Sequence, residues 1–167
     1  MSEFLIELHT GARDVSGFDC GNQDLTDWLV RHAPASHRAD LARTYLALDG
    51  DVVAGYFSIT TGSIRPEEAP KRLARGMPRY PIGTILIARL AVDGRYQRQR
   101  LGSRLLAEAL RRAVAASDTA AARLVVVDAA DDRAVAFYRR WGFVDAPDNP
   151  RRFYRKMSDI RASLDGA

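Results

Sequence analysis

The chain has 167 residues, 47% of them hydrophobic and 28% charged, and its formal net charge is +4. This size and composition are typical of one globular domain, and no run approaches the roughly 20 apolar residues of a membrane span. Cys20 is the only cysteine, which excludes an intrachain disulfide, and Glu3 and Glu7 make the N-terminus unlike a signal peptide. We therefore expect one domain over residues 1–167, with a cytoplasmic location.

The N-terminal third predicts a strand and then a helix. Residues 5–8 form a short apolar strand, and Asn22 is a candidate N-cap for the helix. Pro34 and Ser36 end or interrupt this helix. Its buried stripe contains Leu25, Trp28, Leu29 and a partly buried His32.

The middle of the chain predicts a hairpin and a central strand. Residues 44–48 and 52–60 alternate like strands around an Asp-Gly-Asp turn, which favours an antiparallel pair. Residues 63–80 contain three prolines and read as mixed helix and loop. Residues 84–92 are mostly apolar on both faces, which is typical of a central strand. Arg89 interrupts that run and needs water, a phosphate or a partner.

The C-terminal half alternates helices and strands. Residues 103–116 predict an amphipathic helix, and residues 123–128 a buried strand. A short helix over 131–141 and a strand over 153–157 follow, and the residues from about 158 predict a frayed tail. The buried side of the long helix is predicted to contain Leu105, Leu106, Ala109, Leu110 and Ala113.

Basic residues are concentrated between Arg65 and Arg104, a segment that contains ten basic and only three acidic residues. Arginine forms planar, bidentate contacts with phosphates, so this segment indicates a polyanionic ligand, either a nucleotide cofactor or nucleic acid. A solvated basic face without a ligand is the alternative.

The segment after the central strand predicts a phosphate site. A strand ends, a polar loop over 97–102 follows, and a helix begins at the glycine that closes the loop. The first amides of a helix have no intrahelical acceptor, and the helix dipole is positive there, so they suit a pyrophosphate. A basic helix N-terminus without any ligand remains the other interpretation.

The helix over 131–141 contains a candidate acid. Phe137 and Trp141 share a helix face, and Tyr138 lies beside it. A tyrosine hydroxyl, with a reference pKa near 10, can give a proton to a departing thiolate. An interfacial tyrosine with its hydroxyl in water is the alternative. Gly142 is predicted to close this helix as its C′ residue.

Together these elements resemble the GCN5-related N-acetyltransferase (GNAT) superfamily. Gln97 to Gly102 occupy its six-residue acetyl-CoA pattern Q/R-x-x-G-x-G/A, with Arg100 at the usual fourth-position glycine. Its later pattern N-x-x-A-x-x-x-Y…GF matches with Asp131 in place of Asn. The resemblance implies an α/β (α+β) fold, a mixed central sheet flanked by helices, and acetyl-CoA as cofactor.

The resemblance also implies roles for individual residues. Tyr138 is the expected general acid, and no metal ligands are expected. From the basic cluster and the charge within the apolar strand, instead of the resemblance, Arg79, Arg89 and Arg95 are expected to contact the acceptor substrate. The expected cofactor-binding residues are Leu90, Ala91, Val92, Gln97, Arg98, Gln99, Arg100, Leu101, Gly102, Ser103, Asp131, Ala134 and Phe137.

A narrower resemblance is to GNAT toxins of bacterial toxin–antitoxin systems. It is carried by residues 18–22, Gly55-Tyr56-Phe57, Gly62-Ser63, the segment 78–81 and Arg89 to Asp93. It implies acetylation of the α-amine of an aminoacyl-tRNA, which blocks translation. It also implies a ribbon-helix-helix antitoxin as partner and a homodimer.

The chemistry of the central strand favours an α-amine acceptor. An α-amine has a reference pKa of about 7.7 to 8.0, against about 10.4 for lysine, so it needs little help from a base. Residues 84–92 contain no Asp, Glu or His, and Asp93 either positions a water or caps the turn. Two alternatives stay open: a GNAT enzyme for a small amine or protein N-terminus, and a non-catalytic GNAT-fold binding module.

Overall fold

The computed structural model describes residues 3–166, and its strands form a seven-stranded sheet in the order β1-β2-β3-β4-β5-β7-β6. The sheet is mixed: β4 and β5 are parallel, whereas the pairs β1–β2, β2–β3, β5–β7 and β6–β7 are antiparallel. The predicted fold class is therefore confirmed. Among the described residues, 3–60 with 89–109 make one compact unit, and 61–88 with 110–166 make a second. The single-domain organisation stays a prediction.

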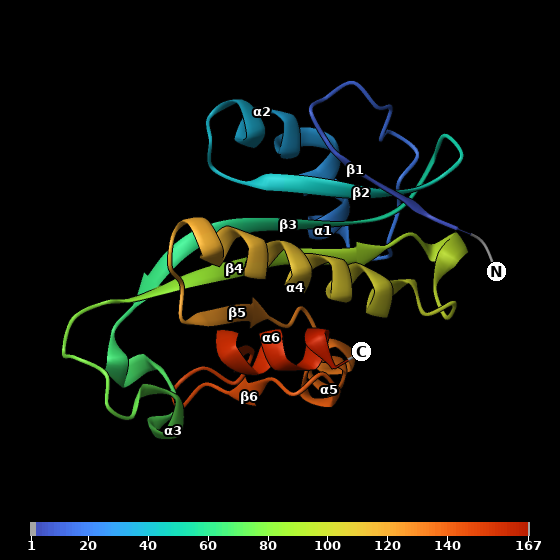
Figure 1. Ribbon diagram of the computed structural model, residues 1–167. Helices are drawn as coiled ribbons and strands as arrows, with labels where there is room; N and C mark the ends of the chain where they lie inside the picture. Colours follow the sequence, from blue (N-terminus) through green and yellow to red (C-terminus); the bar gives the residue numbers. More distant parts are fainter. Residues whose placement is uncertain (1–2, 167) are drawn as a thin grey trace. The chain divides into compact units, whose positions relative to one another are not determined.

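The first unit contains the predicted N-terminal strand and hairpin. β1 (Leu5–Leu8) lies beside β2 (Arg43–Asp49), which pairs with β3 (Val52–Ile64), as Figure 1 shows. A register shift interrupts the β2–β3 pair between Ala47 and Leu48. The core of this unit contains Phe18, Leu29, Leu46, Leu48 and Tyr56.

The helical segment after Asn22 differs from the prediction. α1 (Gln23–Asp27) begins as expected, because the Asn22 side chain accepts a hydrogen bond from the amide of Leu25. A π-helix (Trp28–His32) and α2 (Ala33–Arg38) follow. Pro34 does not end the helix, because it lies in the first turn of α2, where no amide donor is needed. His32 is exposed instead of partly buried, since the wider π turn rotates it away from the apolar stripe.

Like β3, both β4 (Ile82–Val92) and α4 (Leu101–Thr119) contribute residues to both units. β4 is the fourth of the seven strands, so the predicted central position is confirmed. The predicted buried side of α4 is confirmed as well, with no residue of it more than 1% exposed: Leu105, Leu106, Ala109, Leu110 and Ala113.

The second unit contains the remaining elements. A 3₁₀ turn (Pro66–Glu68) and α3 (Lys71–Ala74) precede β4, and β5 (Leu124–Asp128) pairs with β7 (Arg152–Lys156). α5 (Asp132–Arg140) and the two-residue β6 (Val144–Asp145) lie between them in sequence. The core of this unit contains Ile64, Leu73, Leu124, Val126 and Tyr154.

The predicted frayed tail is wrong. α6 (Met157–Asp165) is a helix with Met157 and Ile160 buried. Met157, Ile160 and Leu164 are spaced by three and four residues, which is the spacing of a helical stripe, so burial of this stripe offsets the entropy of ordering the segment. Within residues 3–166, no helix combines the length and apolar character needed to cross a bilayer.

Candidate active site

The loop between β4 and α4 has an unusual backbone. Arg98 and Arg100 have φ values of 65° and 63°, in the left-handed region that glycine enters freely. This conformation costs an L-residue roughly 1–2 kcal/mol. Arg100 therefore adopts a backbone conformation open to the glycine of the acetyl-CoA pattern, with its side chain exposed. The loop has kept a glycine-type backbone although the glycine itself is missing.

Side-chain amides hold this loop in place. The Nε2 of Gln97 donates to the carbonyl oxygens of Cys20 and Val92, both at 3.0 Å, and the Nε2 of Gln99 reaches the Arg95 carbonyl at 3.4 Å. The side-chain Nε2 of Gln97 therefore already donates to two backbone carbonyls. Gln97 fixes the end of β4 relative to the loop, which is a positioning role.

Asp93 caps the turn that follows β4. Its carboxylate, 2% exposed, accepts hydrogen bonds from the amides of Arg95 and Asp19, at 2.9 and 3.1 Å. The Nε and Nη2 atoms of Arg95 donate to it as well, at 2.8 and 3.0 Å. Burial alone would raise the pKa of Asp93, but these four donors outweigh it and the pKa is lowered. Of the two roles left open for Asp93, the structure supports the turn cap, because every acceptor position is occupied.

The start of α4 suits a pyrophosphate. Leu101 is buried, whereas Gly102 and Ser103 are partly exposed, and the first turn of the helix has no acidic residue. Amides at this end have no intrahelical acceptor and lie at the positive end of the dipole. The exposed side chains of Arg98 and Arg100 add positive charge. The residues present therefore fit the pyrophosphate of coenzyme A.

Arg89 is held by an aromatic stack. Its guanidinium carbon lies 3.9 Å from the centroid of Trp28, and Trp28 stacks on Tyr56 at 6.1 Å. The hydroxyl of Tyr56 donates to the Leu25 carbonyl at 2.6 Å, which fixes the stack. Burial lowers the pKa of Arg89, against a smaller opposing effect of Tyr56. A half-buried cation held by π faces keeps its hydrogen-bond donors available for an oxygen ligand.

The sequence did not indicate that Trp28 and Tyr56 act with Arg89. Trp28 was placed on a helical stripe, and Tyr56 in a strand and in a segment of the toxin resemblance, but neither was connected to Arg89. The usable signal was Arg89 itself, since a charge in an apolar strand needs a partner, and aromatic rings as well as carboxylates can supply one.

Tyr138 is buried on α5, with 5% of its surface exposed. Its ring packs edge-on against Phe137 and Phe143, at centroid distances of 5.3 and 5.7 Å. Burial raises the pKa of Tyr138, and the charge of Asp128 adds to the effect. The phenol therefore keeps its proton through neutral pH, as a proton donor must. Its ring is therefore buried, and its role as general acid stays a prediction.

The start and end of α5 form as the sequence predicts. The Oδ1 of Asp131 accepts a hydrogen bond from the amide of Ala134 at 2.9 Å, so Asp caps this helix as Asn would. Gly142, with φ at 84°, follows the last turn in the left-handed conformation, which confirms the predicted C′ position. Ala134 and Phe137 are partly exposed on this helix.

The three arginines expected to bind the acceptor lie in different surroundings. Arg89 is half-buried on Trp28, and Arg95 is bound through two of its nitrogens to Asp93. Both belong to the first unit, whereas Arg79 is an exposed residue of the second. Arg89 is therefore the one of the three whose guanidinium is both positioned and unoccupied by a carboxylate in the described part of the chain.

Comparison with known proteins agrees with the motifs described above. The profile of the acetyltransferase (GNAT) family matches residues 3–143, which include both the loop before α4 and Tyr138. This chain belongs to the GNAT family. Acetyltransferases of this family use acetyl-CoA, for which the start of α4 provides a suitable site.

Individual relatives of this GNAT acetyltransferase are toxins. A protein named tRNA-acetylating toxin, from Mycobacterium tuberculosis, is 37% identical over 92% of each chain. A tyrosine-to-phenylalanine mutant of KacT has a TM-score of 0.89 at 27% identity, over 96% of this chain and 98% of its own. AtaT in complex with acetyl-methionyl-tRNAfMet has a TM-score of 0.89 at 25% identity, over 97% and 99%.

Proposed function

We propose that this acetyltransferase transfers the acetyl group of acetyl-CoA to the α-amine of an aminoacyl-tRNA, and that it acts as the toxin of a toxin–antitoxin system. One observation carries the choice of acceptor. The carboxylate nearest the end of β4, Asp93, is fully occupied by four donors and is not free to take a proton. An α-amine, with a reference pKa of about 7.7 to 8.0, is already partly neutral at pH 7, and the adjacent ester lowers this pKa further, so it needs little help from a base, whereas a lysine, at about 10.4, does not meet this condition.

The named relatives support the same substrate. One is called a tRNA-acetylating toxin, and another was solved with an acetylated aminoacyl-tRNA. The basic residues between Arg65 and Arg104 suit a nucleic acid. The cytoplasm is the proposed location, because charged tRNA is found there. A ribbon-helix-helix antitoxin and a second copy of the chain are the proposed partners.

The proposed mechanism assigns each step to a group of this chain. Acetyl-CoA supplies the activated acetyl thioester. A backbone amide within Leu90 to Val92 donates to the carbonyl oxygen, on which negative charge develops. The amine nitrogen forms the new C–N bond as the C–S bond breaks, the amine loses a proton to water, and Tyr138 gives its proton to the sulfur. Arg89 binds a phosphate or ester oxygen at the acceptor end.

Proton transfer from Tyr138 to the thiolate is slightly unfavourable by the reference pKa values of the two groups. The reference pKa of tyrosine is about 1.5 units above that of a thiol, a difference of about 2 kcal/mol. Burial raises the pKa of Tyr138, but the same apolar surroundings also raise the proton affinity of a thiolate. Burial therefore does not by itself widen this difference, provided that the thiolate lies in the same apolar surroundings.

A direct assay tests the proposed substrate. Incubation with labelled acetyl-CoA and charged total tRNA should place the label on aminoacyl-tRNA, and digestion should yield N-acetylated amino acids. Uncharged tRNA, free amino acids and small amines are the controls. Label on a small amine or a protein N-terminus, with none on charged tRNA, would contradict the proposal. Absence of acetyl-CoA binding by calorimetry would instead favour a non-catalytic module.

The pH dependence provides a second test. We expect the rate to rise with pH through the pKa of the acceptor amine, since only the neutral amine attacks. It should not fall again below about pH 10, the reference pKa of tyrosine, because burial raises the pKa of Tyr138 and keeps it protonated. Initial rates corrected for ester hydrolysis give the profile. A descending limb below pH 9 would show that another group supplies the proton.

A further inference from the structure

The second unit contains two adjoining hollows that the proposed chemistry does not use. The larger has a volume of about 510 Å³ and is lined by the segment 77–83, the C-terminal end of α4 and the start of α6. The smaller, of about 270 Å³, lies between α3, Gly142 and β7. Lys156 lines both. Tyr138, Asp131, Ala134 and Phe137 line neither, so these hollows are distinct from the predicted catalytic residues of this unit.

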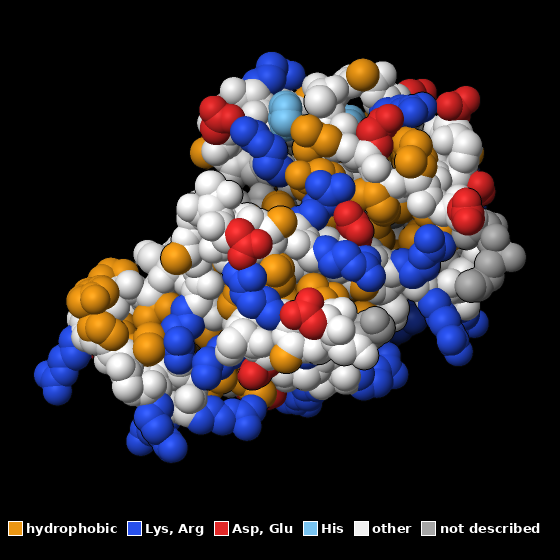
Figure 2. Space-filling model, viewed as in Figure 1, with side chains coloured by type: hydrophobic (Ala, Val, Ile, Leu, Met, Phe, Trp, Pro, Cys, Tyr) orange, Lys and Arg blue, Asp and Glu red, His pale blue; other side chains and the backbone are white. Residues whose placement is uncertain are grey.

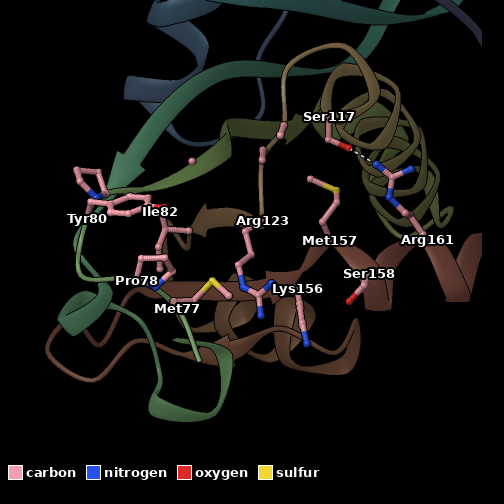
Figure 3. A pocket seen from close by; sticks show the side chains of 14 residues that line it. Met77, Pro78, Tyr80, Ile82, Ser117, Arg123, Lys156, Met157, Ser158 and Arg161 are labelled. Carbon is pink, nitrogen blue, oxygen red and sulfur yellow. Dashed lines mark hydrogen bonds between the residues drawn. The ribbon is translucent and has the colours of Figure 1, made fainter. Parts of the chain in front are cut away.

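The larger hollow combines an apolar wall with positive charge. Figure 3 shows Met77, Pro78 and Tyr80 on one side of it and Met157, Ser158 and Arg161 on the other, with Arg123 and Lys156 between them. Its lining contains no Asp or Glu. Tyr80 is 67% exposed, so a ring face is accessible to a ligand.

Two of the three cations of the larger hollow have no acidic partner among the residues that the structure describes. Arg161 is paired with Asp118 at 2.7 Å, which balances its charge. Arg123 reaches only the Leu73 carbonyl, at 3.4 Å, and no ion pair to a carboxylate is found for Arg123 or Lys156 within residues 3–166. An anion entering this hollow would therefore meet uncompensated charge.

The smaller hollow is open because β6 is short. β6 pairs only with Phe153 and Tyr154, so Arg155 and Lys156 lie beyond its end. Arg155 packs on Gly142, where an added Cβ would lie 3.3 Å from its Nε. Burial lowers the pKa of Arg155, and Asp159 compensates only in part. Arg72 completes a set of three cations facing one carboxylate.

The surrounding surface has the same sign of charge. In Figure 2, Lys and Arg side chains gather over the region of α3 and β6 and outnumber the acidic side chains there. Sites for single-stranded nucleic acid combine a positive groove, which follows the backbone, with an aromatic ring on which a base stacks. The two hollows supply both parts.

We propose that these hollows bind an unpaired nucleotide of the tRNA and the phosphate next to it. The base stacks on Tyr80 against the apolar wall, and Lys156 with Arg123 and Arg155 bind the phosphates. The tRNA as ligand rests on the proposed function. An acidic peptide fits less well, because the cations of the larger hollow lie beside an exposed aromatic ring, Tyr80, on which a base can stack.

Binding of RNA without acetyl transfer tests the proposal. The probes are deacylated tRNA and a single-stranded RNA tetranucleotide, measured by fluorescence anisotropy over a range of salt concentrations. Tyr80→Ala and Lys156→Gln should each weaken binding of both probes by about fivefold to tenfold. Lys156→Gln should also reduce the slope of log affinity against log salt by about 0.7, the value for one single-strand phosphate contact. Acetyl-CoA affinity should not change.

Lys71→Gln is the matched control, because it removes the chain's only other lysine, which is exposed and lines neither hollow. Equal losses in Lys71→Gln and Lys156→Gln would overturn the proposal, since they would show a diffuse charge effect. So would normal RNA binding by Tyr80→Ala, whose exposed position protects folding. Competition by an acidic peptide of matched charge, without tetranucleotide binding, would identify a peptide site instead. The two proposals can also be separated. If the wild-type protein binds the tetranucleotide and the variants do not, but the wild-type protein fails to acetylate charged tRNA, RNA binding by the hollows would be supported and the proposed function rejected.

Discussion

The loop before α4 and the helix α5 both depart from the family pattern at one position, and the two departures have different consequences. Arg100 replaces a glycine and holds a left-handed backbone at a cost of roughly 1–2 kcal/mol. Asp131 replaces an asparagine and makes the same N-cap hydrogen bond, at 2.9 Å to the amide of Ala134. The loop acts through its backbone, so a new side chain is tolerated only with strain. α5 acts through side chains, so an equivalent acceptor is tolerated freely.

The largest effect is expected where the side chain itself does the chemistry. Tyr138→Phe keeps the ring that packs on Phe137 and Phe143 but removes the proton donor. Turnover should fall by about 100-fold or more, as for loss of a general acid, with the melting temperature nearly unchanged. Steady-state rates with charged tRNA measure the loss. Wild-type turnover in a folded Tyr138→Phe protein would exclude this residue as the acid.

The same variant predicts a growth phenotype. Expression of the wild-type chain without its partner should stop growth, and Tyr138→Phe should relieve this. Normal growth of cells that contain soluble, folded wild-type protein would count against the toxin function, whichever residue supplies the proton.

The next effect concerns the loop backbone. Arg100→Val places a β-branched residue in the left-handed region and should weaken acetyl-CoA binding by about tenfold, because the loop must shift or bear more strain. Arg100→Gly is the matched control, since it removes the same charge but accepts the same φ. Calorimetry separates the two causes. Equal losses in both variants would show that the loop binds through the arginine charge.

A smaller effect is expected at the cap of α5. Asp131→Ala should lower the free energy of unfolding by about 1 kcal/mol, because the amide of Ala134 loses its acceptor, whereas Asp131→Asn should be nearly neutral. Chemical denaturation of the two variants measures this difference. Equal destabilisation by Ala and Asn would mean that the negative charge of Asp131 is needed. The loop before α4 and the helix α5 would then differ less in their tolerance of substitution than we infer.

The smallest effect is expected for the stability of Arg100→Gly. Relief of the left-handed arginine should stabilise the fold, but the added freedom of glycine in the unfolded chain opposes it by roughly 0.5–1 kcal/mol. Because the relief is roughly 1–2 kcal/mol, the net change in denaturant titrations should be a small stabilisation of about 0.7 kcal/mol. A loss of more than about 2 kcal/mol would indicate that the arginine side chain has contacts that hold the loop.

Most of the fold could be predicted because its elements carry strong local signals. The apolar stripe of α4 and the alternation of β2 and β3 depend only on nearby residues. α6 was missed although Met157, Ile160 and Leu164 have helical spacing, because its position at the chain end favoured a frayed tail. The two-residue β6 has too little sequence to carry a pattern, and its existence depends on pairing with β7.

Only those parts of the candidate site that follow sequence motifs could be predicted. The Tyr138 helix and the phosphate loop follow motifs of fixed spacing, so they were found from sequence. The stack of Arg89 on Trp28 joins residues far apart in the chain, and no local pattern signals it. The occupied state of Asp93 depends equally on a distant amide, that of Asp19, so the sequence left its role open.

The ties between the phosphate loop and the residues near position 20 have a consequence for dynamics. Gln97 donates to the Cys20 carbonyl, the amide of Asp19 donates to Asp93, and the amide of Gly94 donates to Asp19. A ligand that stabilises the loop must also suppress local opening of this N-terminal segment. Hydrogen exchange at the amides of Asp19 and Gly94 should therefore slow when acetyl-CoA is added, which would let a segment more than 70 residues away in sequence report on occupancy of the cofactor site.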